Sequence, residues 1–232
     1  MEAAGQPGRL VVEPLLCGLS CTTEIAQYSA HAFALVLAFM MAKHGQDLKT
    51  TVYEDHQMRF AMTQSDQTES LTTHSGLTLA VRPVRKDDGE RLRAFFANVA
   101  TDDLRYRFLS GINEVSSDQI AAMVDVDHKQ TEDFLAFVDG DTLVATALIA
   151  TDPAGERSEV AIVVRADHKH KGIGWTMLNH AAAYAKARGV KSLESVESRQ
   201  NKSAIEVERD SGFDVKPYPG DSTLVIVSKQ LA

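Results

Sequence analysis

The stretch from Ser158 to Asn179, SEVAIVVRADHKHKGIGWTMLN, decides the fold. It starts with β-branched and apolar residues, passes through a polar loop with two glycines, and continues into a helical pattern. Such a strand–loop–helix junction presents several backbone N–H groups and the positive end of a helix to one point in space. The glycines let a pyrophosphate approach the backbone, and Lys169 and Lys171 add positive charge. The junction therefore predicts an anion-binding loop, with an ordinary solvated turn as the alternative.

The loop differs from the common nucleotide-binding motifs. The pattern G-x-x-x-x-G-K-S/T of a P-loop is absent, and the third glycine of a dinucleotide fingerprint would fall at Met177. Neither a P-loop enzyme nor a dinucleotide-binding domain is therefore expected.

Strand and helix patterns alternate on both sides of this junction. The expected strands are 77–83, 134–138, 143–150, 159–164, 193–196, 212–215 and 223–228, and the expected helices are 86–98, 102–109, 117–124, 174–188 and 202–210. Asp139-Gly140-Asp141 is typical of a hairpin turn. The pattern predicts an α/β (α+β) domain over residues 77–232.

The first third of the chain has a different character. Residues 1–62 predict a small N-terminal α/β lobe of unknown role, and the polar residues 63–76 predict a linker. A helix expected over 26–41 is apolar on nearly all sides, so it must be buried, and burial in a homodimer is one possibility. Cys17 and Cys21 are expected to be small buried residues, and we expect no metal site.

Composition excludes several classes of function. The 232 residues are 44% hydrophobic and 24% charged, with a formal net charge of −8. That balance argues against a nucleic-acid partner, because no basic excess is available to displace phosphate counterions. The longest apolar run, 30–42, is too short to span a membrane, and the N-terminus lacks a signal-peptide pattern. A cytoplasmic protein is the expectation.

Two motifs resemble those of a known superfamily. Lys169-His170-Lys171-Gly172-Ile173-Gly174 resembles motif A of the GNAT N-acetyltransferases, Q/R-x-x-G-x-G/A, with Lys in the first position. Asn201-Lys202-Ser203-Ala204, followed by Gly212-Phe213, resembles their motif B. The resemblance covers about residues 77–228. It implies a GNAT fold, in which helices flank a central mixed β-sheet that is split into a V.

Within this superfamily, four segments resemble bacterial Pat-type protein lysine acetyltransferases. They are RYRFL at 105–109, DVD at 125–127, FLAFVD at 134–139 and EVAIVVR at 159–165. Pat-type relatives often carry a cyclic-nucleotide-binding domain or an acyl-CoA synthetase, and residues 1–76 are too short for either. The resemblance implies transfer of an acetyl group from acetyl-CoA, as co-substrate, to a primary amine. The leading acceptor is a protein lysine; the alternatives are a small amine (polyamine, amino acid or aminoglycoside) and a non-catalytic acyl-CoA-binding sensor.

The resemblance also implies where acetyl-CoA binds. The backbone of Ile162, Val163 and Val164 is expected to pair with the pantetheine arm, and the N–H of Val163 or Val164 to polarise the thioester carbonyl. The N–H groups of Lys169, His170, Lys171, Gly172, Ile173, Gly174 and Trp175 are expected to hold the pyrophosphate. Core packing is the favoured role of the Trp175 side chain. Asn201 is expected to contact the cofactor or to fix its own loop.

The reaction needs an uncharged amine, whereas a free lysine has a pKa of about 10.4. Glu159, at the head of its strand, resembles the general base of Pat-like enzymes; without that resemblance it would be interpreted as a solvated surface residue. Many GNATs carry a Tyr seven residues after the motif B Asn, but here Glu208 stands there and is expected to be solvated. The thiolate is then protonated by water. His168 and His170 lie in the anion loop and are not expected to be bases.

Overall fold

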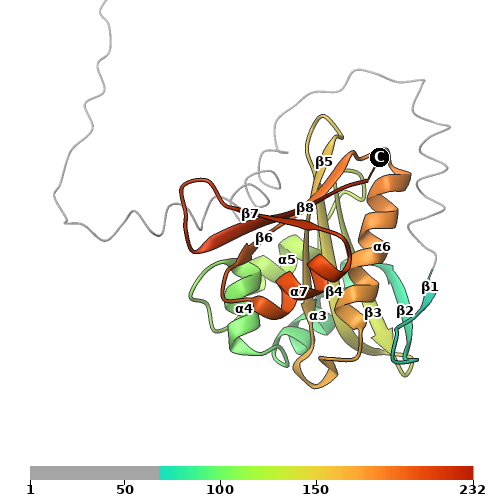
Figure 1. Ribbon diagram of the computed structural model, residues 1–232. Coiled ribbons are helices and arrows are strands. Elements are labelled where there is room, and N and C mark those ends of the chain that lie inside the picture. The colour runs from blue at the N-terminus through green and yellow to red at the C-terminus, as the bar shows by residue number, and fades with distance from the viewer. Residues whose placement is uncertain (1–67, 232) are drawn as a thin grey trace, which may run out of the picture.

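The computed structural model describes residues 68–231, which form a mixed eight-stranded sheet in the order β1-β2-β3-β4-β5-β6-β8-β7 (Figure 1). The strands are β1 (Glu69–Thr72), β2 (Thr78–Pro83), β3 (Thr131–Val138), β4 (Thr142–Thr151), β5 (Arg157–Val164), β6 (Ser192–Ser198), β7 (Asp214–Pro217) and β8 (Leu224–Gln230). The lobe expected over 1–62, its apolar helix and both cysteines lie outside the described residues.

Helices cover both faces of the sheet. They are α3 (Gly89–Phe96), α4 (Thr101–Phe108), α5 (Ser117–Val124), α6 (Ile173–Ala187) and α7 (Lys202–Asp210). One apolar core joins α3, α4 and α5 to one face, and a second joins α6 and α7 to the other. Because successive residues of a strand point to opposite faces, β5 sends Val160 into the α6–α7 core and Val163 into the α3–α5 core. None of the helices described between residues 68 and 231 is long and apolar enough to cross a bilayer.

Local sequence explains several boundaries. Asp139 and Gly140 both have positive φ, at 51° and 89°, in the three-residue turn 139–141 that joins β3 to β4. Ser116 caps α5 in a capping box, since its hydroxyl accepts from the N–H of Gln119 and its own N–H donates to the Gln119 side chain. The helix expected over 86–98 is shorter, because a 3₁₀ turn (Lys86–Asp88) precedes α3.

The sheet is split between β5 and β6. These strands pair in parallel from Arg157↔Ser192 to Glu159↔Glu194, and no pairing follows. β5 continues to Val164 along β4, while β6 continues to Ser198 along β8. The two strands therefore diverge after Glu159, and the expected mixed, V-split sheet is present.

One expectation is corrected by β1. Residues 69–72 fall in the segment expected to be a linker, yet they form a strand that pairs antiparallel with β2. The composition is polar because β1 lies at the edge of the sheet and three of its four residues are exposed. Backbone pairing, rather than burial of side chains, holds the strand in place.

Candidate active site

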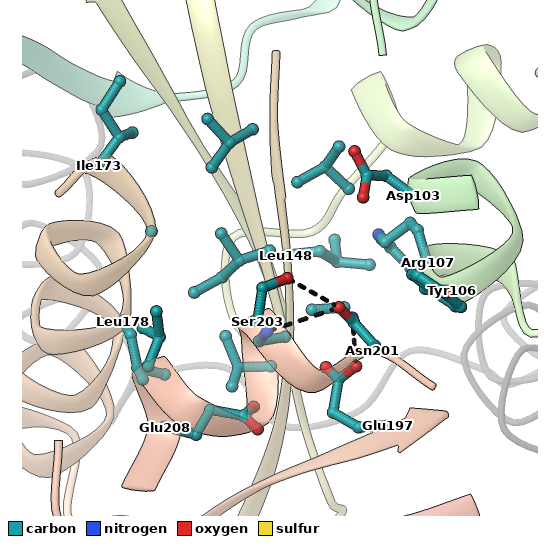
Figure 2. Close-up of a pocket in the computed structure, with 18 of the residues that line it drawn as sticks. Asp103, Tyr106, Arg107, Leu148, Ile173, Leu178, Glu197, Asn201, Ser203 and Glu208 are labelled. Atoms are coloured by element: carbon teal, nitrogen blue, oxygen red, sulfur yellow. Dashed lines mark hydrogen bonds between the residues drawn. The ribbon is translucent and has the colours of Figure 1, made fainter. Parts of the chain in front are cut away.

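A cavity of about 400 Å³ occupies the split between β5 and β6 (Figure 2). Every residue of β5 from Glu159 to Val164 lines it, and Val196 and Glu197 line it from β6. Figure 2 shows Asp103, Tyr106 and Arg107 of α4 on one side and Glu208 of α7 on another. The cavity thus joins the two arms of the V to helices from both faces of the sheet.

The loop 165–172, called here the glycine loop, closes one end of the cavity. His168, Lys169, His170 and Gly172 line the cavity, and α6 begins directly afterwards at Ile173. The first intrahelical bond runs from the N–H of Thr176 to the carbonyl of Gly172 at 3.0 Å. The N–H groups of Ile173, Gly174 and Trp175 therefore lie in the first turn, where a helix has no internal acceptors for them. This end of the cavity has the N–H donors that an anion needs.

The charges in the glycine loop are largely paired with each other or with α4. Lys169 Nζ lies 2.5 Å from Asp103 Oδ2 of α4. His168 Nδ1 lies 2.8 Å from Asp167 Oδ1, and Arg165 Nε lies 2.9 Å from the same oxygen. The positive character of this end therefore depends more on the helix N-terminus than on free lysine charge.

The turn between β1 and β2 supports the glycine loop, which the sequence did not indicate. The Ser75 hydroxyl donates to the carbonyl of Lys171 at 2.8 Å, and the rings of His74 and Trp175 lie 3.8 Å apart. Trp175 is half-buried and lines the cavity, outside both apolar cores, so the favoured core role of this side chain is wrong.

Glu159 occupies the point where β5 and β6 separate. It is half-buried, lines the cavity and belongs to the last pair of the parallel ladder, opposite Glu194. Burial raises the pKa of Glu159 to about 7; the nearby charge of Arg107 opposes this rise, and that of Glu194 adds to it. A carboxyl with that pKa accepts a proton efficiently near neutral pH.

A second group of polar residues lies on the α7 side of the cavity. Asn201 caps α7 and donates from Nδ2 to Glu197 Oε2 at 2.8 Å, so it fixes its own loop as well as lining the cavity (Figure 2). Glu208 is 6% exposed and accepts a hydrogen bond from the Ser195 hydroxyl. The expectation that Glu208 is solvated is therefore wrong. Burial raises the pKa of Glu208 to about 7 and that of Glu197 to about 8.

Sequence reasoning also missed two ionisable residues, Arg107 and Asp133, on the opposite face of the sheet. Burial lowers the pKa of Arg107 in α4, and burial raises the pKa of Asp133 in β3 to about 7. Arg107 Nε is buried without a hydrogen-bond partner among residues 68–231. The sequence signal was Asp133 at the start of the apolar run of β3, whereas Arg107 belongs to a helix with four charged residues and gave no such signal. Within the same residues, no three His, Cys, Asp or Glu side chains gather as a metal site would require.

Comparison with known proteins identifies the family and the fold. The Acetyltransferase (GNAT) family matches residues 96–213, which include α4, the glycine loop and α7. The chain belongs to the GNAT acetyltransferase family. It is therefore an N-acetyltransferase that uses acetyl-CoA as co-substrate.

Individual relatives agree with this assignment. The chain is 29% identical over 171 residues to Acetyltransferase PA5475 of Pseudomonas aeruginosa. This match covers 72% of the chain and 91% of the relative. The crystal structure of the GNAT domain of S. lividans PAT is 26% identical with a TM-score of 0.66, and covers 70% of this chain and 96% of that domain. A spermidine N-acetyltransferase from Vibrio cholerae, in complex with CoA and spermine, shares the fold at 15% identity and a TM-score of 0.55, over 66% of this chain and 95% of its own.

Proposed function

We propose that this GNAT N-acetyltransferase acetylates a lysine side chain of another protein by direct transfer from acetyl-CoA in a ternary complex. The observation that carries the proposal is the position of Glu159, a carboxyl with a pKa of about 7 at the point of the V. The likeness to the GNAT domain of S. lividans PAT and the four Pat-like segments support a protein lysine as acceptor.

In this proposal acetyl-CoA lies along β5 and the first turn of α6. The β5 backbone from Val160 to Val164 has no pairing with β6, so its edge is available to the amides of the pantetheine arm at Ile162, Val163 and Val164. The pyrophosphate is held by the N–H donors at the start of α6, in the part of the chain from Lys169 to Trp175. Asn201 contributes by holding the start of α7 against the cavity.

The chemistry follows from this placement. Glu159 accepts a proton from the lysine ammonium, directly or through water, and the neutral amine attacks the thioester carbon. The carbonyl oxygen gains negative charge, which the N–H of Val163 or Val164 stabilises. The C–S bond then breaks, the amide nitrogen releases its second proton, and water protonates the departing thiolate. The products are the acetylated lysine, CoA with a free thiol, and one proton returned to solvent.

The acceptor side of the cavity is rich in carboxyl groups. Glu159, Glu197 and Glu208 line the cavity, whereas Arg107 is the cationic side chain from α4 that lines it. The ionised form of these carboxyl groups, which grows as the pH rises above about 7, favours an acceptor that arrives as a cation. A polyamine shares this property, and it is the second candidate.

Protein and small-amine acceptors can be separated by one experiment. The full chain is incubated with acetyl-CoA and either an acyl-CoA synthetase bearing a reactive lysine or a panel of polyamines, amino acids and aminoglycosides. Thiol release and intact mass are measured in parallel, with an enzyme-free sample as background. A gain of one acetyl group on the protein above background supports the proposal, whereas thiol release with small amines alone overturns it.

Glu159→Gln tests the proposed base. Because glutamine cannot accept the proton, we expect kcat to fall about 100-fold or more, while the affinity for CoA stays unchanged. Glu206→Gln is the matched control, since Glu206 is exposed and does not line the cavity. Wild-type turnover in Glu159→Gln would refute the assignment of Glu159 as the base.

Homodimerisation through residues 26–41 stays a separate proposal, tested by light scattering of the full chain over a range of concentrations.

A further inference from the structure

Two carboxyl groups stand side by side at the point of the V. Glu159 and Glu194 are partners in the last pair of the parallel ladder. Paired residues of neighbouring strands point to the same face, and the strands themselves lie about 4.8 Å apart. Glu194 does not line the cavity, and its Oε1 lies 3.9 Å from Nη1 of Arg157. A second carboxyl group is thus next to Glu159 but away from the space for substrate.

Arg107 of α4 carries a positive charge that acts on the Glu159 carboxyl. Glu159 and Val163 share a face of β5, and Val163 packs in the core formed with α3, α4 and α5. Arg107 of α4 lines the same cavity as Glu159. The register Asp133↔Leu148↔Ala161 places Asp133 on this face as well, one strand beyond β4. Arg107 therefore lies over a sheet face that carries Asp133 and Glu159.

These charges act on Glu159 in opposite directions. The guanidinium of Arg107 favours the ionised form of Glu159, whereas the carboxyl of Glu194 disfavours it. Arg107 interacts in addition with Asp133 of β3 and with Glu197 of β6. The charge of Glu159 in turn disfavours the ionised form of Glu197. The charges that act on Glu159 are thus one cation from α4 and the carboxyl of Glu194 from β6, with Asp133 and Glu197 competing for the cation.

We propose that Arg107 and Glu194 are positioning residues that set the proton affinity of Glu159 from opposite sides, so that the base is ionised yet still basic near neutral pH. The proposal rests on the proposed function of Glu159 as the base. Arg107 keeps the buried carboxyl from staying protonated, and Glu194 keeps it from becoming too weak a base. Each residue acts through Glu159 rather than on the acetyl group.

The first test is the pH dependence of kcat/KM in four variants. Glu194→Gln removes the repelling charge, so the acidic limb is expected to move to lower pH. Arg107→Gln removes the attracting charge, so the limb is expected to move to higher pH, and Arg107→Lys is expected to restore it in part. Glu114→Gln, at an exposed position outside the cavity, is the matched control and should leave the profile unchanged.

Opposite movements are the result that a purely structural role cannot give. Loss of packing would lower the rate at every pH without moving the limb. If Arg107→Gln does not fold, Glu194→Gln still decides the matter, because Glu194 is 29% exposed and pairs with the exposed Arg157. An acidic limb that stays in place, or moves to higher pH, in a folded Glu194→Gln protein overturns the proposal.

A second test does not depend on activity. The full chain is labelled with ¹³C at the glutamate side-chain carboxyl, and Glu159 is assigned by the signal lost in Glu159→Gln. Its titration midpoint is then measured by NMR in the parent chain and in the two charge variants. Midpoints that move in opposite directions in the two charge variants support the proposal. This conclusion holds even if Glu159→Gln turns over normally, a result that would refute only the role of Glu159 as the base. Unmoved midpoints together with an inactive Glu159→Gln refute the tuning and leave the base intact.

Discussion

Gly172 offers a sharp test of how the glycine loop is held. It has a φ of 77° and stands directly before α6, and a Cβ added there would lie 3.4 Å from the backbone nitrogen of His74. Gly172→Ala therefore faces two demands at once: a left-handed backbone and contact with the β1–β2 turn. Gly189, just after α6, has a φ of 82° and no atom within 4 Å of an added Cβ. Gly189→Ala is thus a control that carries the same backbone strain without the contact.

The expected magnitudes differ between the two variants. A left-handed alanine costs about 1 kcal/mol, which lowers Tm by about 2–4 °C in a domain of this size. Both variants should show that loss. In Gly172→Ala the added Cβ also touches the β1–β2 turn at the tight end of ordinary contact, so any relaxation of the strained left-handed backbone displaces the N–H donors at the start of α6. Loss of one hydrogen bond to a charged group is worth about 1.5–3 kcal/mol, so Kd for CoA should rise about tenfold or more.

Isothermal titration calorimetry with CoA and thermal unfolding measure both quantities. Gly189→Ala should bind CoA like the parent chain and unfold a few degrees earlier. Equal CoA affinity in the two variants would refute the reasoning, because it would mean that the β1–β2 turn and the geometry of Gly172 do not control the donors of α6.

Three further predictions concern support, pH and packing. Ser75→Ala removes the hydrogen bond from its hydroxyl to the Lys171 carbonyl, so Kd for CoA should rise a few-fold with a stability loss of about 1 kcal/mol or less. Ser222→Ala, at an exposed position that does not line the cavity, is the control in the same calorimetry and should leave Kd unchanged. Burial raises the pKa of Asp133 from 3.8 to about 7, so the folded state binds the proton of this carboxyl more tightly than the unfolded state does. The protonated carboxyl therefore stabilises the fold at low pH, and this stability is lost as the pH rises from about 4 towards 7. Asp133→Asn should therefore flatten the fall of Tm over that window, and an unchanged slope would contradict the assignment. Leu193→Ala, at a fully buried position between β5 and β8, should reduce the free energy of unfolding in urea by about 2–5 kcal/mol, whereas a loss below 1 kcal/mol would show that the core does not close around it.

The errors at β1, Glu208 and Trp175 have a common physical origin. Each was interpreted from its local sequence, and each depends on a segment that lies far away along the chain. β1 is a strand because β2 accepts its backbone bonds, and Glu208 is buried because Ser195 and the cavity wall cover it. Trp175 lies against His74, a residue of the segment expected to be a linker. From local sequence a polar side chain is predicted to be exposed to solvent. Only the folded structure shows whether another element covers that side chain.

The sequence by itself determined the order of strands and helices from β2 to β8, the hairpin at Asp139-Gly140, the glycine loop before α6 and the place of Glu159 on the strand before that loop. These features depend on side-chain period, turn chemistry and capping, which act between residues close in the chain. Only the tertiary structure decided that Arg107 and Glu194 lie near Glu159, and that Arg107 also interacts with Asp133 and Glu197. The pKa values of Glu159 and Arg107 depend on burial and on charges brought together from different elements, and neither is set until the chain has folded.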